Sequence, residues 1–106
     1  MNKGAIKTIV ADAFGISVAD INGRCRRQPI AIARQVCYYY CRKHLGLTYH
    51  NIGERFHRDH AAIMWGVRQV EDQRQTNPEV SRVLDAIEEF HPALAMRAIG
   101  DLALVA

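Results

Sequence analysis

Two groups of polar side chains dominate the chemistry that this sequence offers. One is Arg58-Asp59-His60, and the other is the arginine loop, Arg24-Cys25-Arg26-Arg27. A guanidinium binds phosphate and fits a narrow minor groove, a carboxylate accepts a hydrogen bond from a cytosine amino group, and an imidazole can lie against a thymine methyl. No nucleophile and base are arranged as in an enzyme, so no catalytic residue is predicted. These residue types favour contact with a nucleic acid.

The elements expected to position Arg58-Asp59-His60 are two helices joined by a very short turn. The first has Thr48 as a candidate N-cap, with Ile52 and Phe56 four residues apart on one face. The second should continue to about Gln75, and its apolar stripe consists of Ile63, Gly66, Val67 and Val70. This pattern predicts a helix-turn-helix at about 48–70, and in that motif the first turn of the second helix meets base edges in the major groove.

The distribution of charge agrees with this interpretation. The net charge is only +3, but residues 1–70 hold 11 Lys or Arg against 4 Asp or Glu, a balance of +7. Residues 71–106 hold 3 against 7, a balance of −4. A one-sided positive field suits a polyanion. The alternative is a solvated basic face, which is common in small proteins.

A helix from Pro29 to about His44 is predicted to be the central packing helix, since proline fits the first helical position and Gly46 ends the pattern. Its apolar stripe is Ile30, Ala33, Val36, Cys37, Tyr40, Cys41 and His44. The opposite, outward side should carry Arg34, Gln35, Tyr38, Arg42 and Lys43. Of the three consecutive tyrosines, one ring should lie in the core and another should be exposed.

The remaining elements are also helical, which makes the chain all-α. Helices are expected over Lys3–Phe14, ending at Gly15, and from Ser17 through Ile21, where Ser17 and Asp20 resemble a capping box. Asn77-Pro78 should start an amphipathic helix with Val80, Val83, Leu84, Ile87 and Phe90 on one face. After His91-Pro92, residues 93–105 are expected to form a last helix.

Composition excludes several classes of protein. The chain has 106 residues, of which 49% are hydrophobic and 24% charged, and no apolar run approaches the roughly 20 residues of a membrane span. Its three cysteines lack the spacing of a disulfide scaffold, so a reducing cytoplasm is expected. Cys37, Cys41 and His44 share a helical face but are interpreted as core residues, because no second pair of metal ligands is evident. Neither a metal nor a cofactor is predicted.

With Arg58-Asp59-His60 and the arginine loop, the chain resembles the C-terminal DNA-binding domain of the bacterial chromosomal replication initiator DnaA. The resemblance covers roughly residues 5 to 75. The matching pieces are Ile16-Ser17-Val18-Ala19-Asp20-Ile21, the arginine loop, Ala33-Arg34-Gln35-Val36, Ile52-Gly53-Glu54-Arg55-Phe56 and Arg58-Asp59-His60. It implies an all-α fold with the helix-turn-helix and the basic loop, similar to the Trp repressor.

The resemblance also implies sequence-specific binding of double-stranded DNA in replication initiation or its regulation. The recognition helix, Arg58–Ala62, would enter the major groove, and Arg26, with Arg24 and Arg27 beside it, would enter the minor groove. Asp59, His60, Ala61 and Ala62 would face bases. Gln35 and Arg42 would hold the phosphate backbone. Arg58, at the start of the recognition helix, and Lys43 are also expected to contact DNA.

The chain departs from the family pattern at several points. Ala61 and Ala62 stand where the family usually has threonines, one of which reads bases, and only His57 occupies a turn that normally has two small residues. The 106 residues contain no Gly-x-x-x-x-Gly-Lys-Ser/Thr phosphate loop, so these residues hold no ATPase module. The expectation favours a stand-alone relative of the initiator domain over a fragment of a longer protein, encoded by a chromosome, a plasmid or a phage and located in the cytoplasm or nucleoid.

Two further functions stay open. One is a transcriptional regulator with the same fold, which would bind palindromic sites if it dimerised. The other is a protein-interaction module that has lost base recognition, motivated by Ala61, Ala62 and the acidic C-terminal part. The proposed organisation is a DNA-binding core over residues 1–75 and a helical extension over 76–106, which would pack on the core or mediate association. Replication or regulatory proteins would then bind through residues 71–106, and the chain would be a monomer or a homodimer.

Overall fold

The computed structural model describes residues 2–24 and 27–96, which form an all-helical domain without a strand. Its helices are α1 (Lys3–Phe14), α2 (Val18–Asn22), α3 (Ile30–Lys43), α4 (Tyr49–Phe56), α5 (His60–Thr76) and α6 (Pro78–Phe90), followed by a 3₁₀ helix, η1 (Pro92–Ala95). None of these helices has the length and apolar character needed to cross a membrane. The all-helical structure of the described residues confirms the predicted all-α fold class.

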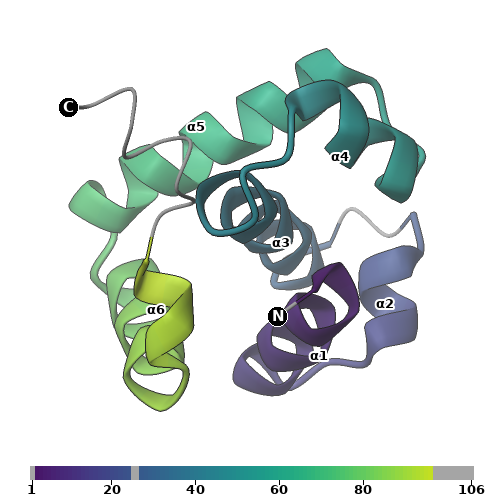
Figure 1. Cartoon of the computed structure of the whole chain (residues 1–106). Helices are drawn as coiled ribbons and strands as arrows, with labels where there is room; N and C mark the ends of the chain where they lie inside the picture. The colour runs from purple at the N-terminus through teal and green to yellow at the C-terminus, as the bar shows by residue number, and fades with distance from the viewer. Residues whose placement is uncertain (1, 25–26, 97–106) are drawn as a thin grey trace, which may run out of the picture.

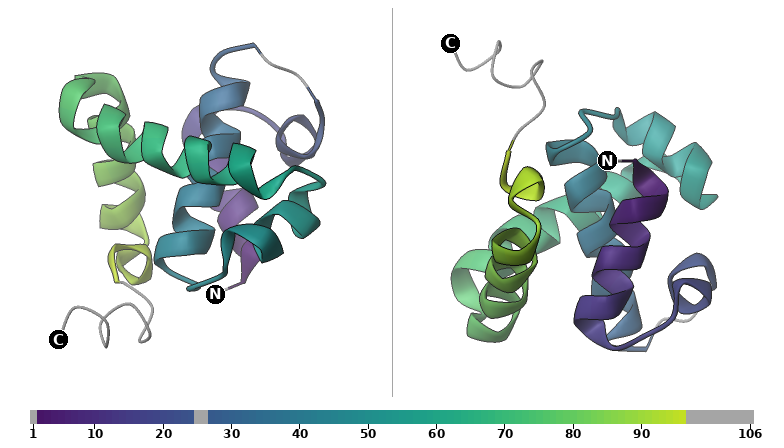
Figure 2. Two further views of the ribbon diagram at one scale, coloured as in Figure 1. Left: turned by 90° about the horizontal axis from the view of Figure 1, so that it is seen from above. Right: turned by 60° about the horizontal axis from the view of Figure 1, so that its bottom comes forward.

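Helix α3 is the centre of the packing, as Figure 1 shows. It contacts α1, α2, α4 and α5, and α5 crosses over it in the left view of Figure 2. Val36, Cys37 and Tyr40 of α3 have no exposed surface. The crossing with α5 is close because Gly66 has no side chain: a Cβ there would lie 3.1 Å from Cδ2 of Tyr38. The predicted stripe of α5 does face the core, since Ile63, Gly66, Val67 and Val70 are all buried.

Local signals for helix ends are confirmed. Ser17 and Asp20 form a complete capping box at α2, and Gly15 ends α1 in the left-handed conformation at φ 68°. The Thr48 side chain accepts a hydrogen bond from the Asn51 backbone at 3.1 Å, and Asn77 caps α6 directly before Pro78.

Three predictions about packing were wrong. Tyr38, Tyr39 and Tyr40 are all buried, at 5%, 7% and 0% exposure. Tyr38 is enclosed because its ring meets Phe56 edge-on at 4.9 Å between centroids. Arg34 belongs to the interior and not to the outward side of α3, with 6% of its surface exposed.

The third wrong prediction concerns the C-terminal helix. Residues 92–95 form the 3₁₀ helix η1, in which Leu94 is fully buried, and Met96 is extended. The side chain of His44 lies against this end, with its Nδ1 3.1 Å from the Met96 carbonyl oxygen. The rest of the expected helix, residues 97–105, lies outside the described residues.

Helix α6 is held on the core by apolar and polar contacts. Val80, Leu84 and Ile87 are buried. Glu88 accepts hydrogen bonds from the Tyr40 hydroxyl at 2.9 Å and from Arg74 at 2.6 Å, and Arg74 also reaches Asp85 at 3.1 Å. Burial opposes the charge of Arg74, but its hydrogen bonds to Glu88, Tyr39 and Asp85 outweigh that cost and raise its pKa. Helix α6 is thus packed along α1 and α5 and hydrogen-bonded to Tyr40 of α3.

Candidate nucleic-acid interface

The turn between α4 and α5 is fixed by backbone contacts. His57 ends α4 in the left-handed conformation, at φ 57° and ψ 47°, and the Arg58 N–H donates to the Gly53 carbonyl at 2.8 Å. A Cβ on Gly53 would lie 2.5 Å from the Arg58 carbonyl oxygen. Glycine is therefore needed at position 53 because the returning chain occupies the space of a side chain.

The position of Arg58 differs from the expectation. The turn comprises His57, Arg58 and Asp59, and α5 begins at His60, so Arg58 lies in the turn and not in the recognition helix. Its side chain is half-buried. The predicted second helix otherwise continues as expected, to Thr76.

Asp59 occupies the N-cap position of α5, but its carboxylate does not cap the backbone. Instead Oδ1 lies 3.2 Å from Nδ1 of His60, with the side chains 72% and 58% exposed. The N–H groups of Ala62 and Ile63 are bonded to the Asp59 carbonyl oxygen, at 3.0 and 3.2 Å. The first turn of α5 therefore presents an exposed carboxylate and imidazole, followed by the exposed Ala61 and Ala62.

The Arg34 side chain holds α2, the helix that leads into the arginine loop. Its Nε donates to the Ile21 carbonyl at 2.8 Å, and its Nη2 donates to the Asp20 carbonyl at 3.1 Å. Both acceptors belong to α2, which leads directly into the loop. Sequence reasoning missed this role; the available signal was that Arg34 precedes the buried Cys37 and Cys41 by three and seven residues, on the same helical face.

The predicted loop arginines are exposed where the structure describes them, at Arg24 and Arg27, while Arg26 lies outside the described residues. The Arg27 carbonyl accepts a hydrogen bond from the Ala31 N–H at 3.0 Å, which ties the end of the loop to α3. Helix α2 and the α4–α5 turn lie on the same side of α3 in Figure 1 and in the left view of Figure 2. The loop thus begins on the side of the molecule where α5 starts.

The three predicted DNA-contact residues of α3, Gln35, Arg42 and Lys43, are half-buried and contact neighbouring residues. The Cγ of Gln35 packs 3.2 Å from the Cβ position of Gly66. Arg42 donates to the Leu47 carbonyl at 3.2 Å and lies 4.9 Å over the Tyr49 ring, while Lys43 donates to the Tyr39 hydroxyl at 3.2 Å. Each cation keeps N–H groups for an external anion, since a guanidinium has five and an ammonium three.

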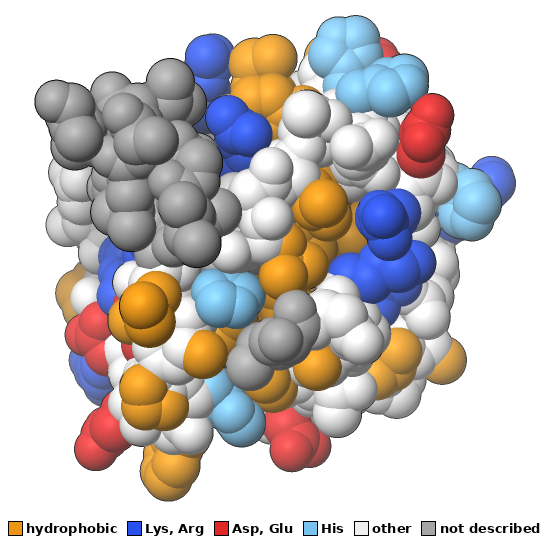
Figure 3. Space-filling model, viewed as in Figure 1, with side chains coloured by type: hydrophobic (Ala, Val, Ile, Leu, Met, Phe, Trp, Pro, Cys, Tyr) orange, Lys and Arg blue, Asp and Glu red, His pale blue; other side chains and the backbone are white. Residues whose placement is uncertain are grey.

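Charge is unevenly placed on the surface. Figure 3 shows Lys and Arg side chains gathered between α1 and α4, and acidic side chains over α6. Lys7, on α1, lies 4.6 Å over the Phe56 ring of α4. Burial and the neighbouring Lys3 lower the pKa of Lys7, as expected where cations are clustered. The helix pair therefore borders a positive surface.

Comparison with known proteins identifies the family. The family model described as "Bacterial dnaA protein helix-turn-helix" matches residues 4–70, a stretch that includes α4 and the start of α5. The chain is 32% identical over 98 residues to Chromosomal replication initiator protein DnaA 1 of Chlamydia pneumoniae, covering 82% of this chain and 21% of that protein. It is 32% identical over 84 residues to Chromosomal replication initiator protein DnaA of Gloeobacter violaceus, covering 78% of this chain and 19% of that protein.

The chain thus spans about a fifth of the length of these relatives. The match ends at residue 70, so it contains all of α4, the turn that depends on Gly53 and the exposed start of α5. On this evidence the chain belongs to the helix-turn-helix family of bacterial DnaA proteins.

Proposed function

We propose that this protein binds double-stranded DNA sequence-specifically and acts in replication initiation or its regulation. The observation that carries the proposal is the exposed first turn of α5, held by the α4–α5 turn, in a chain of the DnaA helix-turn-helix family. Relatives are named as replication initiators, which motivates the biological role.

In this proposal the start of α5 reads the major groove. The Asp59 carboxylate would accept from a cytosine amino group, and the His60 imidazole would lie against a neighbouring base. The 3.2 Å contact between the Asp59 carboxylate and the His60 imidazole keeps the two groups together at the exposed start of α5. Ala61 and Ala62 are exposed and offer only methyl groups, which suit a thymine methyl rather than a hydrogen bond.

The arginine loop would supply the second contact, in the minor groove. Arg24 and Arg27 are exposed, and Arg26 lies between them in the sequence. A narrow minor groove concentrates negative potential and so attracts a guanidinium. Arg34 supports this role indirectly, because its bonds to the Asp20 and Ile21 carbonyls hold the helix from which the loop leaves.

Backbone contacts would come from Gln35, Arg42, Lys43 and Arg58. Such contacts set the register of the protein on DNA and carry no sequence information. The hydrogen bonds of Arg42 to Leu47 and of Lys43 to Tyr39 restrict these long side chains before DNA arrives, which lowers the entropy cost of binding.

The test is binding to duplexes carrying a DnaA-box sequence or its scrambled form, across a salt series. Each neutralised phosphate should contribute about −0.9 to the slope of log affinity against log salt. His60→Ala should weaken the preferred duplex by ~1–3 kcal/mol and hardly affect the scrambled one, whereas Arg42→Ala should weaken both. Arg82→Ala, which removes an exposed arginine side chain from α6, is the control for loss of a positive charge. Absence of binding to every duplex at low salt would refute the proposal.

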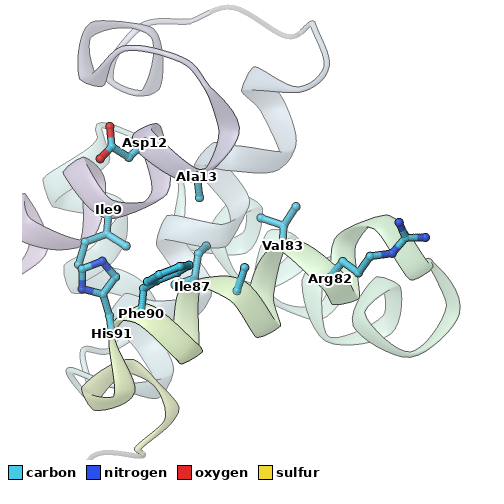
Figure 4. A pocket seen from close by; sticks show the side chains of 9 residues that line it. Ile9, Asp12, Ala13, Arg82, Val83, Ile87, Phe90 and His91 are labelled. Atoms are coloured by element: carbon cyan, nitrogen blue, oxygen red, sulfur yellow. The ribbon is translucent and has the colours of Figure 1, made fainter.

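The alternative function, protein interaction through the C-terminal part, is favoured by a groove between α1 and α6 (Figure 4). The groove has a volume of about 570 Å³ and is bordered by Phe90, of which 79% is exposed. Apolar side chains of Ile9, Val83 and Ile87 line it, with Asp12 on the α1 wall and Arg82 on the α6 wall. We propose that residues 1–75 bind DNA, and that residues 76–106 stabilise this core and contact a partner here.

The occupant that fits this groove is an amphipathic helix of a partner protein. Its apolar face would cover Phe90 and Val83, a basic side chain would meet Asp12 and an acidic one Arg82. Reversing both charges, with Asp12→Lys and Arg82→Glu, should abolish recovery of a specific replication or regulatory protein while leaving DNA affinity within about twofold. Unchanged recovery of that protein would rule out the groove as the contact.

A further inference from the structure

We infer that Trp65 is a specificity-determining residue of this DNA interface, and that it contacts thymine methyl groups in the major groove. The inference rests on the proposed DNA binding and names a contact that the resemblance did not assign. Trp65 is the only tryptophan of the chain and has 59% of its surface exposed. An indole left in water on a recognition helix forfeits a large burial energy, which points to a surface that becomes covered.

Its place on α5 directs it away from the core. Trp65 follows the fully buried Ile63 by two residues, which is roughly 200° around a helix of about 3.6 residues per turn. Ala61 precedes it by four residues and Arg68 follows it by three, so these side chains share one exposed stripe. Trp65 therefore lies one turn beyond the exposed Ala61, about 140° around the helix axis from His60.

The small side chains of Ala61 and Ala62 leave space on α5 for the Trp65 indole. Side chains on a helix lean toward its N-terminus, so we expect the Trp65 indole to lie over the turn that contains Ala61 and Ala62. Both alanines are exposed, and neither side chain extends beyond Cβ. The surface that longer residues would occupy is therefore available to the indole.

The apolar surface of Trp65, Ala61 and Ala62 is suited to contact an apolar group of DNA. In the major groove the thymine C5-methyl is the apolar group that distinguishes base pairs. Packing an indole face against it removes apolar area from water on both partners. Arg68, exposed one turn further along, supplies a positive charge for the adjoining phosphates. Ala61 and Ala62 cannot hydrogen-bond through their side chains, so methyl recognition by Trp65 would restore discrimination at this turn.

The experiment replaces single thymines by deoxyuridine in a duplex selected by the wild-type chain, because this change deletes only the methyl group. At one or two positions the replacement should weaken wild-type binding by about four- to fifteenfold, as burial of about one to two methylene equivalents predicts. Trp65→Ala should bind the unmodified duplex correspondingly less tightly and should be indifferent to deoxyuridine at those positions. Trp65→Phe should be intermediate.

Two controls accompany the uridine series. Phe90→Ala removes an exposed aromatic ring from α6 and should keep the full wild-type response to deoxyuridine. Far-UV circular dichroism should show the same unfolding midpoint for Trp65→Ala and the wild type, because the side chain is exposed. Saturating duplex should also change the emission of this single tryptophan.

The possible outcomes distinguish a failure of the Trp65 inference from a failure of the proposed DNA binding. If the wild type binds duplexes in a His60-dependent way but Trp65→Ala responds to every deoxyuridine as the wild type does, the inference about Trp65 is wrong and DNA binding stands. A loss of affinity that is equal on all sequences would make Trp65 a backbone contact and would also overturn methyl recognition. If no duplex binds, both the inference and the proposed function fail.

Discussion

At the scale of single residues, the helix-turn-helix depends on a position where a side chain would clash with the turn. Gly53 is buried in α4, and the Arg58 carbonyl oxygen occupies the place of its absent side chain. The neighbouring His57 adopts a left-handed conformation without being glycine, and its N–H closes α4 on the Gly53 carbonyl. The angle between α4 and α5 therefore depends on a backbone-to-backbone approach.

Gly53→Ala should destabilise the fold by about 1–3 kcal/mol, because a methyl group 2.5 Å from a backbone oxygen forces the turn to move. Urea unfolding followed by circular dichroism measures this. Gly4→Ala is the matched control: it lies in α1, its Cβ would meet nothing closer than the Asn2 side chain at 3.4 Å, and the change should be neutral or stabilising. Equal stability of the two variants would contradict the role of Gly53.

The cysteines of α3 behave as core residues and not as ligands or nucleophiles. Cys37 and Cys41 are free thiols with 0% and 1% exposure. Burial raises the pKa of Cys41 to about 11 and raises that of Cys37 as well. The folded state thus favours the protonated thiols, and this contribution to stability is present below their ordinary pKa and is lost as pH rises toward 11.

In a Cys25→Ser background, a thiol reagent at pH 8 should modify Cys37 and Cys41 at least tenfold more slowly than an unfolded control, since only the thiolate reacts. Urea at the unfolding midpoint should restore the reaction. The unfolding free energy should also fall between pH 9 and 11, and Cys41→Ala should reduce that fall. Rapid modification of the folded chain at pH 8 would show that these thiols are accessible.

At the scale of elements, α6 is attached to α3 and α5 through one carboxylate. Glu88 accepts from Tyr40, which has no exposed surface, and from Arg74, whose side chain is 25% exposed. Burial raises the pKa of the Tyr40 hydroxyl, and the charge of Glu88 and its hydrogen bond raise it further. The Tyr39 hydroxyl links the same network to Lys43, on the side proposed to contact DNA.

Glu88→Ala should cost about 1.5–3 kcal/mol of unfolding free energy, because it leaves the Tyr40 hydroxyl and the Arg74 guanidinium without their acceptor. Calorimetric or urea unfolding provides the measurement. Glu89→Ala is the matched control, since Glu89 is exposed, and it should change stability by less than about 0.5 kcal/mol. Glu88→Gln should retain part of the stability by keeping an acceptor oxygen. A Glu88→Ala variant as stable as Glu89→Ala would show that α6 is held by apolar contacts alone.

At the scale of the whole molecule, the charge balance is +7 over residues 1–70 and −4 over residues 71–106. The basic residues border α1, α4 and the arginine loop, whereas acidic side chains lie over α6 and the later part of α5. Such a field orients the chain with its helix-turn-helix toward a polyanion before contact is made.

Neutralising three exposed acidic residues, with Glu71→Gln, Asp72→Asn and Glu89→Gln, should raise DNA affinity several-fold at low salt. The gain should shrink once the screening length falls to about 10 Å near 0.1 M salt. The plot of log affinity against log salt should therefore be steeper for the variant, although the same phosphates are neutralised. Gln75→Ala, a neutral change on the same helix, is the control. An unaltered affinity at low salt would show that the acidic side chains lie too far from the DNA to matter.

Local features of this protein were determined by sequence alone. The capping box of Ser17 and Asp20, the left-handed Gly15 and the buried stripe of α5 were predicted correctly, because each depends on residues within a turn or two along the chain. The family resemblance was likewise readable from short matching segments, and the comparisons confirm it.

Tertiary structure alone decided which polar and aromatic side chains enter the core. Arg34 was predicted to be exposed, yet its partners are carbonyls 13 and 14 residues earlier, which only packing of α2 on α3 brings within reach. The three tyrosines are all buried because α1, α2, α4 and α5 pack around α3 and Glu88 of α6 reaches the Tyr40 hydroxyl, whereas periodicity describes one helix at a time. The same limit applies to Arg58: it was predicted in the recognition helix, but it lies in the turn, where its carbonyl oxygen occupies the space beside Gly53.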